Sequence, residues 1–193
     1  MKEKLAGLTS NIVNPFVVAV VVLALIALKT SSDVPHAVQW ILVTIAISVL
    51  PIFILVILLL RFKKLDGIFN NSREQRTKIY VVAVVLGAVD SLLLWYFKAP
   101  QLLLETFCAG LVAVAVFTVI NHYWKISLHT AFITAGVAML IIVYGASMAW
   151  GLVFLPFVGW SRMVLKQHSL AQVSIGGLLA AVIVSGVFSL FRL

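Results

Sequence analysis

Residues 37–60 read AVQWILVTIAISVLPIFILVILLL, an apolar run without a single charged side chain. A helix needs about 20 mostly apolar residues to cross the hydrocarbon core of a bilayer. This run is long enough, whereas the strands of a transmembrane barrel alternate apolar and polar residues over about ten positions. The stretch therefore predicts a membrane-spanning α-helix.

The rest of the chain has the same character. Of its 193 residues, 63% are hydrophobic and only 10% are charged, a composition typical of membrane proteins and outside the range of soluble globular domains. The apolar runs lie near 13–29, 37–60, 79–97, 101–121, 127–146, 147–163 and 171–191. The run at 147–163 is short and hardly separated from the one before it. We therefore expect an all-α polytopic transmembrane helical bundle with six or seven spans, in which residues 1–193 form a single domain.

The positive charge is unevenly distributed. The net charge is +8, and a chain with seven spans places eleven of the fourteen basic residues on the face that carries the N-terminus. These are Lys2, Lys4, Arg61, Lys63, Lys64, Arg73, Arg76, Lys78, Lys125, Arg162 and Lys166. In a membrane protein such an excess indicates topology and lipid headgroups rather than nucleic acid. It either sets the topology, which would point this face to the cytoplasm, or builds an anion site.

Three polar segments of this face combine positive charge, hydroxyl groups and histidines. They are Ser72-Arg73-Glu74-Gln75-Arg76, Lys125-Ile126-Ser127-Leu128-His129 and the stretch from Ser161 to Gln172. Each adjoins an apolar run, so their side chains can meet in the headgroup layer. Ser127 and His129 open a span whose N-terminal amides attract anions. His168 and Gln172 are one helical turn apart, which suits an imidazole oriented by an amide.

The pair Ser161-Arg162 is followed at a fixed spacing by His168 and then by Gln172. This pattern resembles the third motif, S-R-x5-H-x3-D, of the type-2 phosphatidic acid phosphatase (lipid phosphate phosphatase) superfamily. Gln172 takes the position of the aspartate, and its amide oxygen can accept the same hydrogen bond without carrying the charge.

The other two family motifs are matched in part. Ser127 and His129 match the second motif, P-S-G-H, with its proline and glycine replaced. Of the first motif, K-x6-R-P, only Arg76 is present, and Arg73 or Lys125 is a candidate for the missing lysine charge. The resemblance covers roughly residues 73–172.

The resemblance implies an integral membrane phosphatase that hydrolyses a lipid phosphate monoester or diphosphate, such as phosphatidate, a phosphatidylglycerol phosphate or a polyprenyl phosphate. It makes His168 the nucleophile of a phosphohistidine intermediate, His129 the acid and base, and Gln172 the partner that orients His168. The implied phosphate-binding residues are Arg162, Arg76, Arg73, Lys125, Ser127 and Ser161. It implies neither a metal nor another cofactor. The expected partners are a membrane lipid substrate and the bilayer, without nucleic acid, in the plasma membrane of a prokaryote.

A second interpretation is a small membrane transporter or a catalytically inactive phosphatase-like membrane protein. Asp90 and Glu105 lie inside apolar runs, where a carboxylate is costly. They favour neutral or hydrogen-bonded packing groups over a proton relay. The small-residue runs Gly176-x3-Ala180 and Gly177-x3-Ala181 favour close helix packing and leave a homo-oligomer as the alternative.

Overall fold

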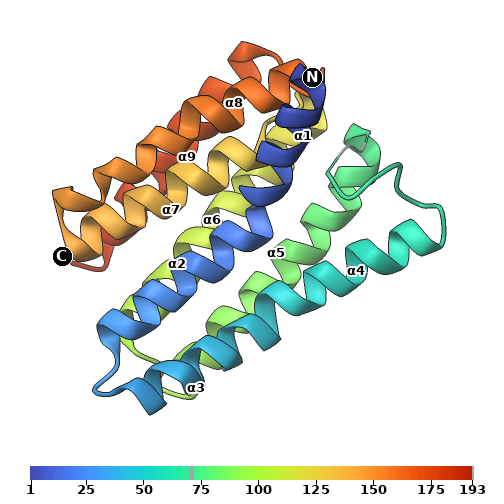
Figure 1. Cartoon of the computed structure of the whole chain (residues 1–193). Helices are drawn as coiled ribbons and strands as arrows, with labels where there is room; N and C mark the ends of the chain where they lie inside the picture. Colours follow the sequence, from blue (N-terminus) through green and yellow to red (C-terminus); the bar gives the residue numbers. More distant parts are fainter. Residues whose placement is uncertain (70–71, 193) are drawn as a thin grey trace. The chain divides into compact units, whose positions relative to one another are not determined.

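A computed structural model of the chain describes residues 1–69 and 72–192 (Figure 1). These residues form helices joined by short connections and contain no strand. The helices are α1 (Lys2–Ile12), α2 (Pro15–Thr30), α3 (Val34–Thr44), the π-helical turn η1 (Ile45–Val49), α4 (Leu50–Arg61), α5 (Arg73–Tyr96), α6 (Gln101–Tyr123), α7 (Leu128–Tyr144), the 3₁₀ helix η2 (Ala146–Val153), α8 (Phe154–Val164) and α9 (Leu170–Leu190). The prediction of an all-α protein is confirmed for the described part of the chain.

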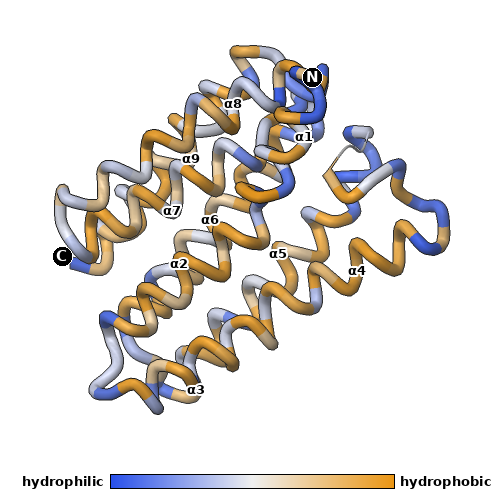
Figure 2. The backbone as a smooth tube through the Cα atoms, in the orientation of Figure 1, coloured by the Kyte–Doolittle hydropathy of each residue, from blue (hydrophilic) through white to orange (hydrophobic). Residues whose placement is uncertain are grey.

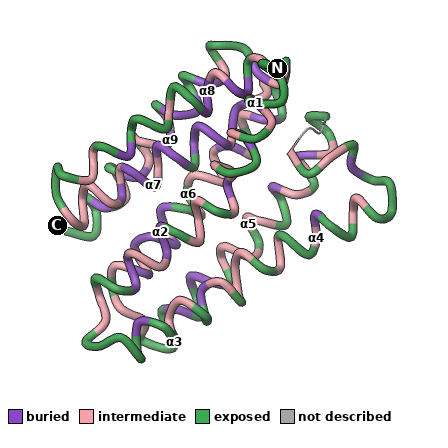
Figure 3. The backbone as a smooth tube through the Cα atoms, viewed as in Figure 1, coloured by how far each residue is buried: buried purple, intermediate pink, exposed green. Residues whose placement is uncertain are grey.

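Within the described residues, five helical segments are long and apolar enough to cross a membrane. They are Lys2–Thr30, Val34–Arg61, Arg73–Tyr96, Gln101–Tyr123 and Leu170–Leu190. Figure 2 shows that the helices are mostly hydrophobic, with hydrophilic residues at several of their ends. Figure 3 shows exposed positions along these helices. Many of the exposed residues are large and apolar, among them Leu42 (63%), Val85 (58%) and Leu178 (67%). Exposed apolar surface on this scale suits contact with lipid rather than water, so these helices are consistent with a helical membrane bundle.

The two remaining apolar runs have a different form. The run at 127–146 forms α7, which is apolar but only 17 residues long. It ends at Gly145, whose φ of 96° belongs to the left-handed region that favours glycine. The run at 147–163 forms η2 followed directly by α8.

Side-chain hydrogen bonds define the starts of two helices, α5 and α2. The predicted run begins at residue 79, whereas α5 begins at Arg73, because Ser72 and Gln75 form a capping box there. Between α1 and α2, the Asn14 side-chain oxygen accepts the N–H groups of Phe16 and Val17. A separate short helix, α1, therefore precedes α2.

The chain divides into two compact units, Met1–Leu25 with Ile126–Leu193, and Ile26–Lys125. In the second unit α5 and α6 pack along each other, and α4 packs against α5. The connection between α5 and α6 is short, so the two helices are antiparallel. The prediction of a single domain stays a prediction.

In the first unit, α7 packs along α9, and α8 contacts both of them as well as α1 (Figure 1). The Ser127 N–H donates to the Gln172 carbonyl at 3.3 Å, which joins the start of α7 to the start of α9. The two helices therefore run parallel, and the η2–α8 segment returns the chain from the end of one to the start of the other. This return brings the second and third motifs to the same end of the unit.

Two glycines of α9 permit its close approach to α7. A Cβ atom on Gly176 would lie 2.9 Å from the Ser127 carbonyl oxygen, and one on Gly177 would lie 2.9 Å from Thr134 Oγ1. Gly176 and Gly177 are both buried. The prediction that the small-residue runs provide close packing within the bundle is confirmed for these two positions.

We expect Gly176→Ala to destabilise the first unit, whereas Gly186→Ala in the same helix does not. Alanine at 176 must push Ser127 away, and overpacking typically costs about 1–3 kcal/mol. A Cβ atom on Gly186 meets nothing within 4 Å, so that variant gains only helix propensity, about 1 kcal/mol. Thermal unfolding of both variants in detergent is the measurement. A midpoint for Gly176→Ala at or above that of Gly186→Ala would contradict the packing described here.

Candidate functional site

The C-terminal end of α8 folds back so that His168 returns to Arg162. Lys166 has a φ of 54° and ends the helix in the left-handed conformation typical of such caps. The N–H groups of Gln167 and His168 then both donate to the Arg162 carbonyl, at 3.0 and 3.3 Å. The number of residues between Arg162 and His168 is therefore the number needed to finish the last turn of α8 and fold back.

The start of α9 orients the His168 ring. Ser169 caps the helix, and its N–H donates to Gln172 Oε1 at 3.1 Å. His168 Nδ1 lies 3.1 Å from the same oxygen. Because a backbone N–H can only donate, it establishes that the oxygen of the Gln172 amide is on this side. Nδ1 is therefore the donor to Gln172, and the lone pair of a neutral His168 ring is on Nε2.

A second histidine comes from the first turn of α7. His129 is 3% exposed, and its Nε2 lies 3.3 Å from the hydroxyl oxygen of Ser10 in α1. Arg162 is 2% exposed, and its Nη1 donates to the same Ser10 oxygen at 2.6 Å. The side chains of α7 and α8 thus meet at one oxygen atom supplied by α1.

Two further hydroxyls of the motifs are fully buried. The exposed fractions of Ser127 and Ser161 are both 0%. Within the residues that the structure describes, neither Oγ has a hydrogen-bond partner. A buried hydroxyl without a partner is uncommon and costs free energy. Each of these hydroxyls therefore has an unused hydrogen-bond donor. Ser161 adjoins Arg162 in the sequence, and Ser127 lies two residues before His129.

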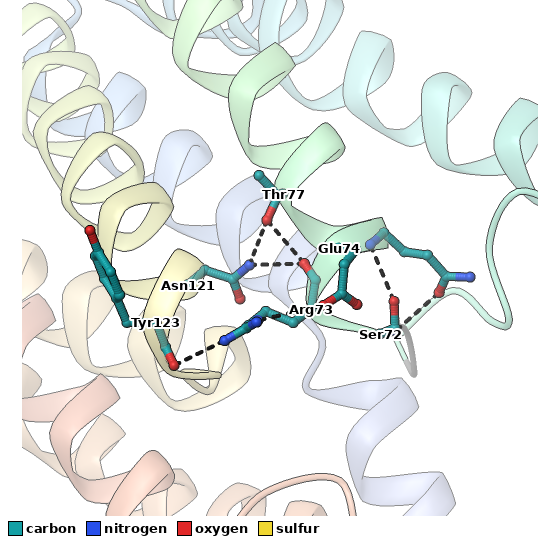
Figure 4. Close-up of polar contacts among 7 residues, drawn as sticks. Ser72, Arg73, Glu74, Thr77, Asn121 and Tyr123 are labelled. Atoms are coloured by element: carbon teal, nitrogen blue, oxygen red, sulfur yellow. Dashed lines mark hydrogen bonds and ion pairs between the residues drawn. The ribbon is translucent and has the colours of Figure 1, made fainter.

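Arg73, in the second unit, contacts the end of α6 (Figure 4). Its Nη1 donates to the Tyr123 carbonyl at 3.0 Å, and the Asn121 amide donates to the Arg73 carbonyl at 3.0 Å. Asn121 Nδ2 also lies 3.0 Å from Thr77 Oγ1. These bonds tie the start of α5 to the end of α6, a structural role that the motif comparison does not foresee.

The other two predicted phosphate ligands outside the first unit are Arg76 and Lys125. Arg76 is 8% exposed; its Nη2 donates to the hydroxyl of Tyr80, and its guanidinium carbon lies 5.3 Å from the centre of that ring. Lys125 is half-buried in the connection between α6 and α7. The structure thus places six of the nine predicted site residues in the first unit, and Arg73, Arg76 and Lys125 in the second.

Ser10 is the site residue that the sequence analysis missed. It lies outside residues 73–172, and a single serine in a short N-terminal helix carries no motif. The sequence holds only a weak signal, that Ala6 and Ser10 are small residues one helical turn apart. The structure shows that they are the two buried residues of α1.

The carboxylates inside the apolar helices lie in the second unit. Asp90 and Glu105 are 3% and 2% exposed. Glu105 Oε1 accepts a hydrogen bond from Gln101 Nε2 at 2.8 Å, as expected for a hydrogen-bonded packing group. Among the described residues, no group of three or more His, Cys, Asp or Glu side chains is arranged to hold a metal ion.

Comparisons with protein-family models, with curated proteins and with solved structures found no match for this chain. The geometry of the first unit is therefore the basis for any functional argument.

The orientation of His168 can be tested directly. In protein with ¹⁵N-labelled histidine, we expect neutral His168 to carry its proton on Nδ1, because Gln172 Oε1 accepts it. Gln172→Leu removes the acceptor and should give a mixture of both ring tautomers, whereas Gln172→Glu, with the same length, should keep the Nδ1 proton. NMR spectra of the ring nitrogens, assigned with His168→Asn, provide the measurement. Identical His168 signals in the wild type and Gln172→Leu would show that Gln172 does not orient the ring.

Proposed function

We propose that the protein is an integral membrane phosphatase that hydrolyses a lipid phosphate monoester or diphosphate, with a fold like that of the lipid phosphate phosphatases. One observation carries the proposal. The buried guanidinium of Arg162 lies at the end of the first unit where two histidines are each held at a defined ring nitrogen, one by Gln172 and one by Ser10. A cation beside a nucleophile and an acid–base group is the arrangement that phosphoryl transfer needs.

In the first step, the Nε2 lone pair of His168 attacks phosphorus while the bond to the lipid oxygen breaks. His129 protonates that leaving oxygen, so the lipid departs as an alcohol, or as a monophosphate when the substrate is a diphosphate. The Nδ1–H of His168 remains hydrogen-bonded to Gln172 Oε1, which stabilises the ring as it gains positive charge. The product is a phosphohistidine.

In the second step, His129 takes a proton from water, and the hydroxide attacks the phosphorus of the phosphohistidine. The bond to His168 Nε2 breaks, and inorganic phosphate leaves. Throughout both steps Arg162 binds the phosphoryl oxygens, and the hydroxyls of Ser127 and Ser161 donate to them. Arg76, Arg73 and Lys125 are the proposed further cations, and the reaction needs no metal.

The lengths of the helices support seven spans. Because α7 and α9 run parallel, the segment from Ala146 to Val164 has to cross the same layer in the opposite direction. Eight residues of 3₁₀ helix and eleven of α-helix reach about 32 Å at rises of about 2.0 and 1.5 Å per residue. The hydrocarbon core is about 30 Å thick. Because a 3₁₀ helix rises further per residue than an α-helix, this short segment is long enough to cross the core.

Phosphate release in detergent, without divalent metal, tests the function. Phosphatidate, a phosphatidylglycerol phosphate and a polyprenyl diphosphate would each be offered to the wild type and to His168→Ala. We expect His168→Ala to lose on the order of 10³-fold or more in kcat, since it removes the nucleophile. His129→Ala should lose about 10²- to 10⁴-fold, since it removes the acid.

His122→Ala is the matched control, because His122 is exposed at the end of α6, six residues before α7 begins at Leu128. This variant should keep wild-type activity. Equal phosphate release from the wild type and His168→Ala would refute the proposal.

We place the site on the cytoplasmic face of the plasma membrane of a prokaryote. Without the four candidate ligands Arg73, Arg76, Lys125 and Arg162, the N-terminal face still has seven basic residues against three on the other, which favours the cytoplasm.

Cysteine labelling tests this orientation in a Cys108→Ala background. Lys166 and Lys98 are matched positions, because both are exposed, follow a helix end and have φ values of 54° and 53°. On intact cells, an impermeant maleimide should label Lys98→Cys and spare Lys166→Cys. The reverse pattern would place the site outside the cell.

The buried carboxylates favour one alternative, a small membrane transporter. A transporter should depend on Asp90 or Glu105, whereas the phosphatase should release phosphate at wild-type rates after Asp90→Asn or Glu105→Gln, provided that the protein folds. A catalytically inactive phosphatase-like protein would release no phosphate from any of the three lipids.

A further inference from the structure

Helix α1 supplies one buried polar side chain to the first unit. Most residues of α1 are exposed, but Ser10 is 2% exposed and lies where α1 packs on α8. A hydroxyl at this position has to find its partners inside the protein, because water does not reach it.

Ser10 has two side-chain partners within the described part of the chain, Arg162 and His129. A guanidinium can only donate, so the Ser10 oxygen accepts from Arg162 Nη1. The same oxygen has a second lone pair, which accepts from His129 Nε2, 3.3 Å away, when that nitrogen carries the proton needed for acid catalysis. One hydroxyl oxygen thus contacts both the guanidinium of Arg162 and the Nε2 atom of His129.

The position of this oxygen has a chemical meaning. The Ser10 oxygen lies 2.6 Å from Arg162 Nη1 and 3.3 Å from His129 Nε2. An oxygen atom at this position is within hydrogen-bond distance of both a cation and an acid–base nitrogen. In phosphate-ester hydrolysis, the oxygen that needs both is the leaving oxygen, which gains negative charge and then a proton.

We propose that Ser10 is a positioning residue of the active site, which holds Arg162 and His129 around the place that the leaving oxygen of the substrate will take. This inference rests on the proposed function. In the substrate-free protein the Ser10 hydroxyl occupies that place, and on binding it yields His129 Nε2 to the substrate oxygen. Helix α1 is therefore part of the catalytic apparatus and not only the beginning of the first span.

The kinetic test compares Ser10→Ala with Thr9→Ala. Thr9 is the neighbouring hydroxyl of α1; it donates to the Leu5 carbonyl within the helix and belongs to no site. We expect Ser10→Ala to lower kcat about 10- to 100-fold with KM changed less than about threefold, because misplaced catalytic groups slow the chemical step rather than binding. Ser10→Thr keeps the hydroxyl and should recover most of kcat, and Thr9→Ala should match the wild type.

A double-mutant comparison separates positioning from a general structural effect. If Ser10 acts through His129 and Arg162, adding Ser10→Ala to His129→Ala should lower kcat by a smaller factor than Ser10→Ala does in the wild type, since interacting residues are not additive. Full additivity, wild-type kcat in Ser10→Ala, or a lowered KM with kcat retained would each overturn the proposal.

A spectroscopic readout is independent of activity. In protein with ¹⁵N-labelled histidine, the ring signals of His129, assigned with His129→Asn, should be the same in the wild type and Thr9→Ala and should shift in Ser10→Ala. If even the wild type releases no phosphate from any lipid, the proposed function fails, and these spectra still decide whether Ser10 holds the ring. Identical His129 signals in all three proteins would overturn the positioning role.

Discussion

The burial of the Arg162 guanidinium is the constraint around which the first unit is organised. A cation that is 2% exposed has to be hydrogen-bonded, because an unpaired buried charge is far more costly than any single packing defect. One of its N–H groups is satisfied by Ser10, which requires α1 to lie against α8. The same hydroxyl reaches His129, which ties α7 to the pair. The charge thus links three helices that are distant in the sequence.

Backbone hydrogen bonds also fix the position of the second histidine, His168. The left-handed turn at Lys166 sends the chain back over the Arg162 carbonyl, and the capping box of α9 presents Gln172 Oε1 to His168. Glutamine suits the third position of such a box and also orients the imidazole. A carboxylate at this position would add charge, but the amide already defines the tautomer. The amide at position 172, where the motif that this segment resembles has an aspartate, is therefore compatible with an oriented imidazole.

The close contact of α7 and α9 connects packing to this chemistry. Gly176 lies against the Ser127 carbonyl, and the Ser127 N–H bonds to the Gln172 carbonyl. The start of each helix is thus set by the other. In lipid there is little hydrophobic driving force for helices to associate. Close approach at small residues, together with buried hydrogen bonds, holds them together instead. Packing in the helix interiors therefore determines the positions of the site residues at the helix ends.

The amino-acid sequence is sufficient to predict the helical class, the approximate apolar runs and the pairing of His168 with Gln172, because hydrophobic length and helical spacing are local properties. It also indicated the residues around Arg162, since their spacing reflects one helix end and its turn. The packing of the helices was needed to show that Ser10 joins Arg162 to His129, and that Arg73 donates to the Tyr123 carbonyl. These are contacts between helices, and no local pattern encodes which buried donor meets which acceptor.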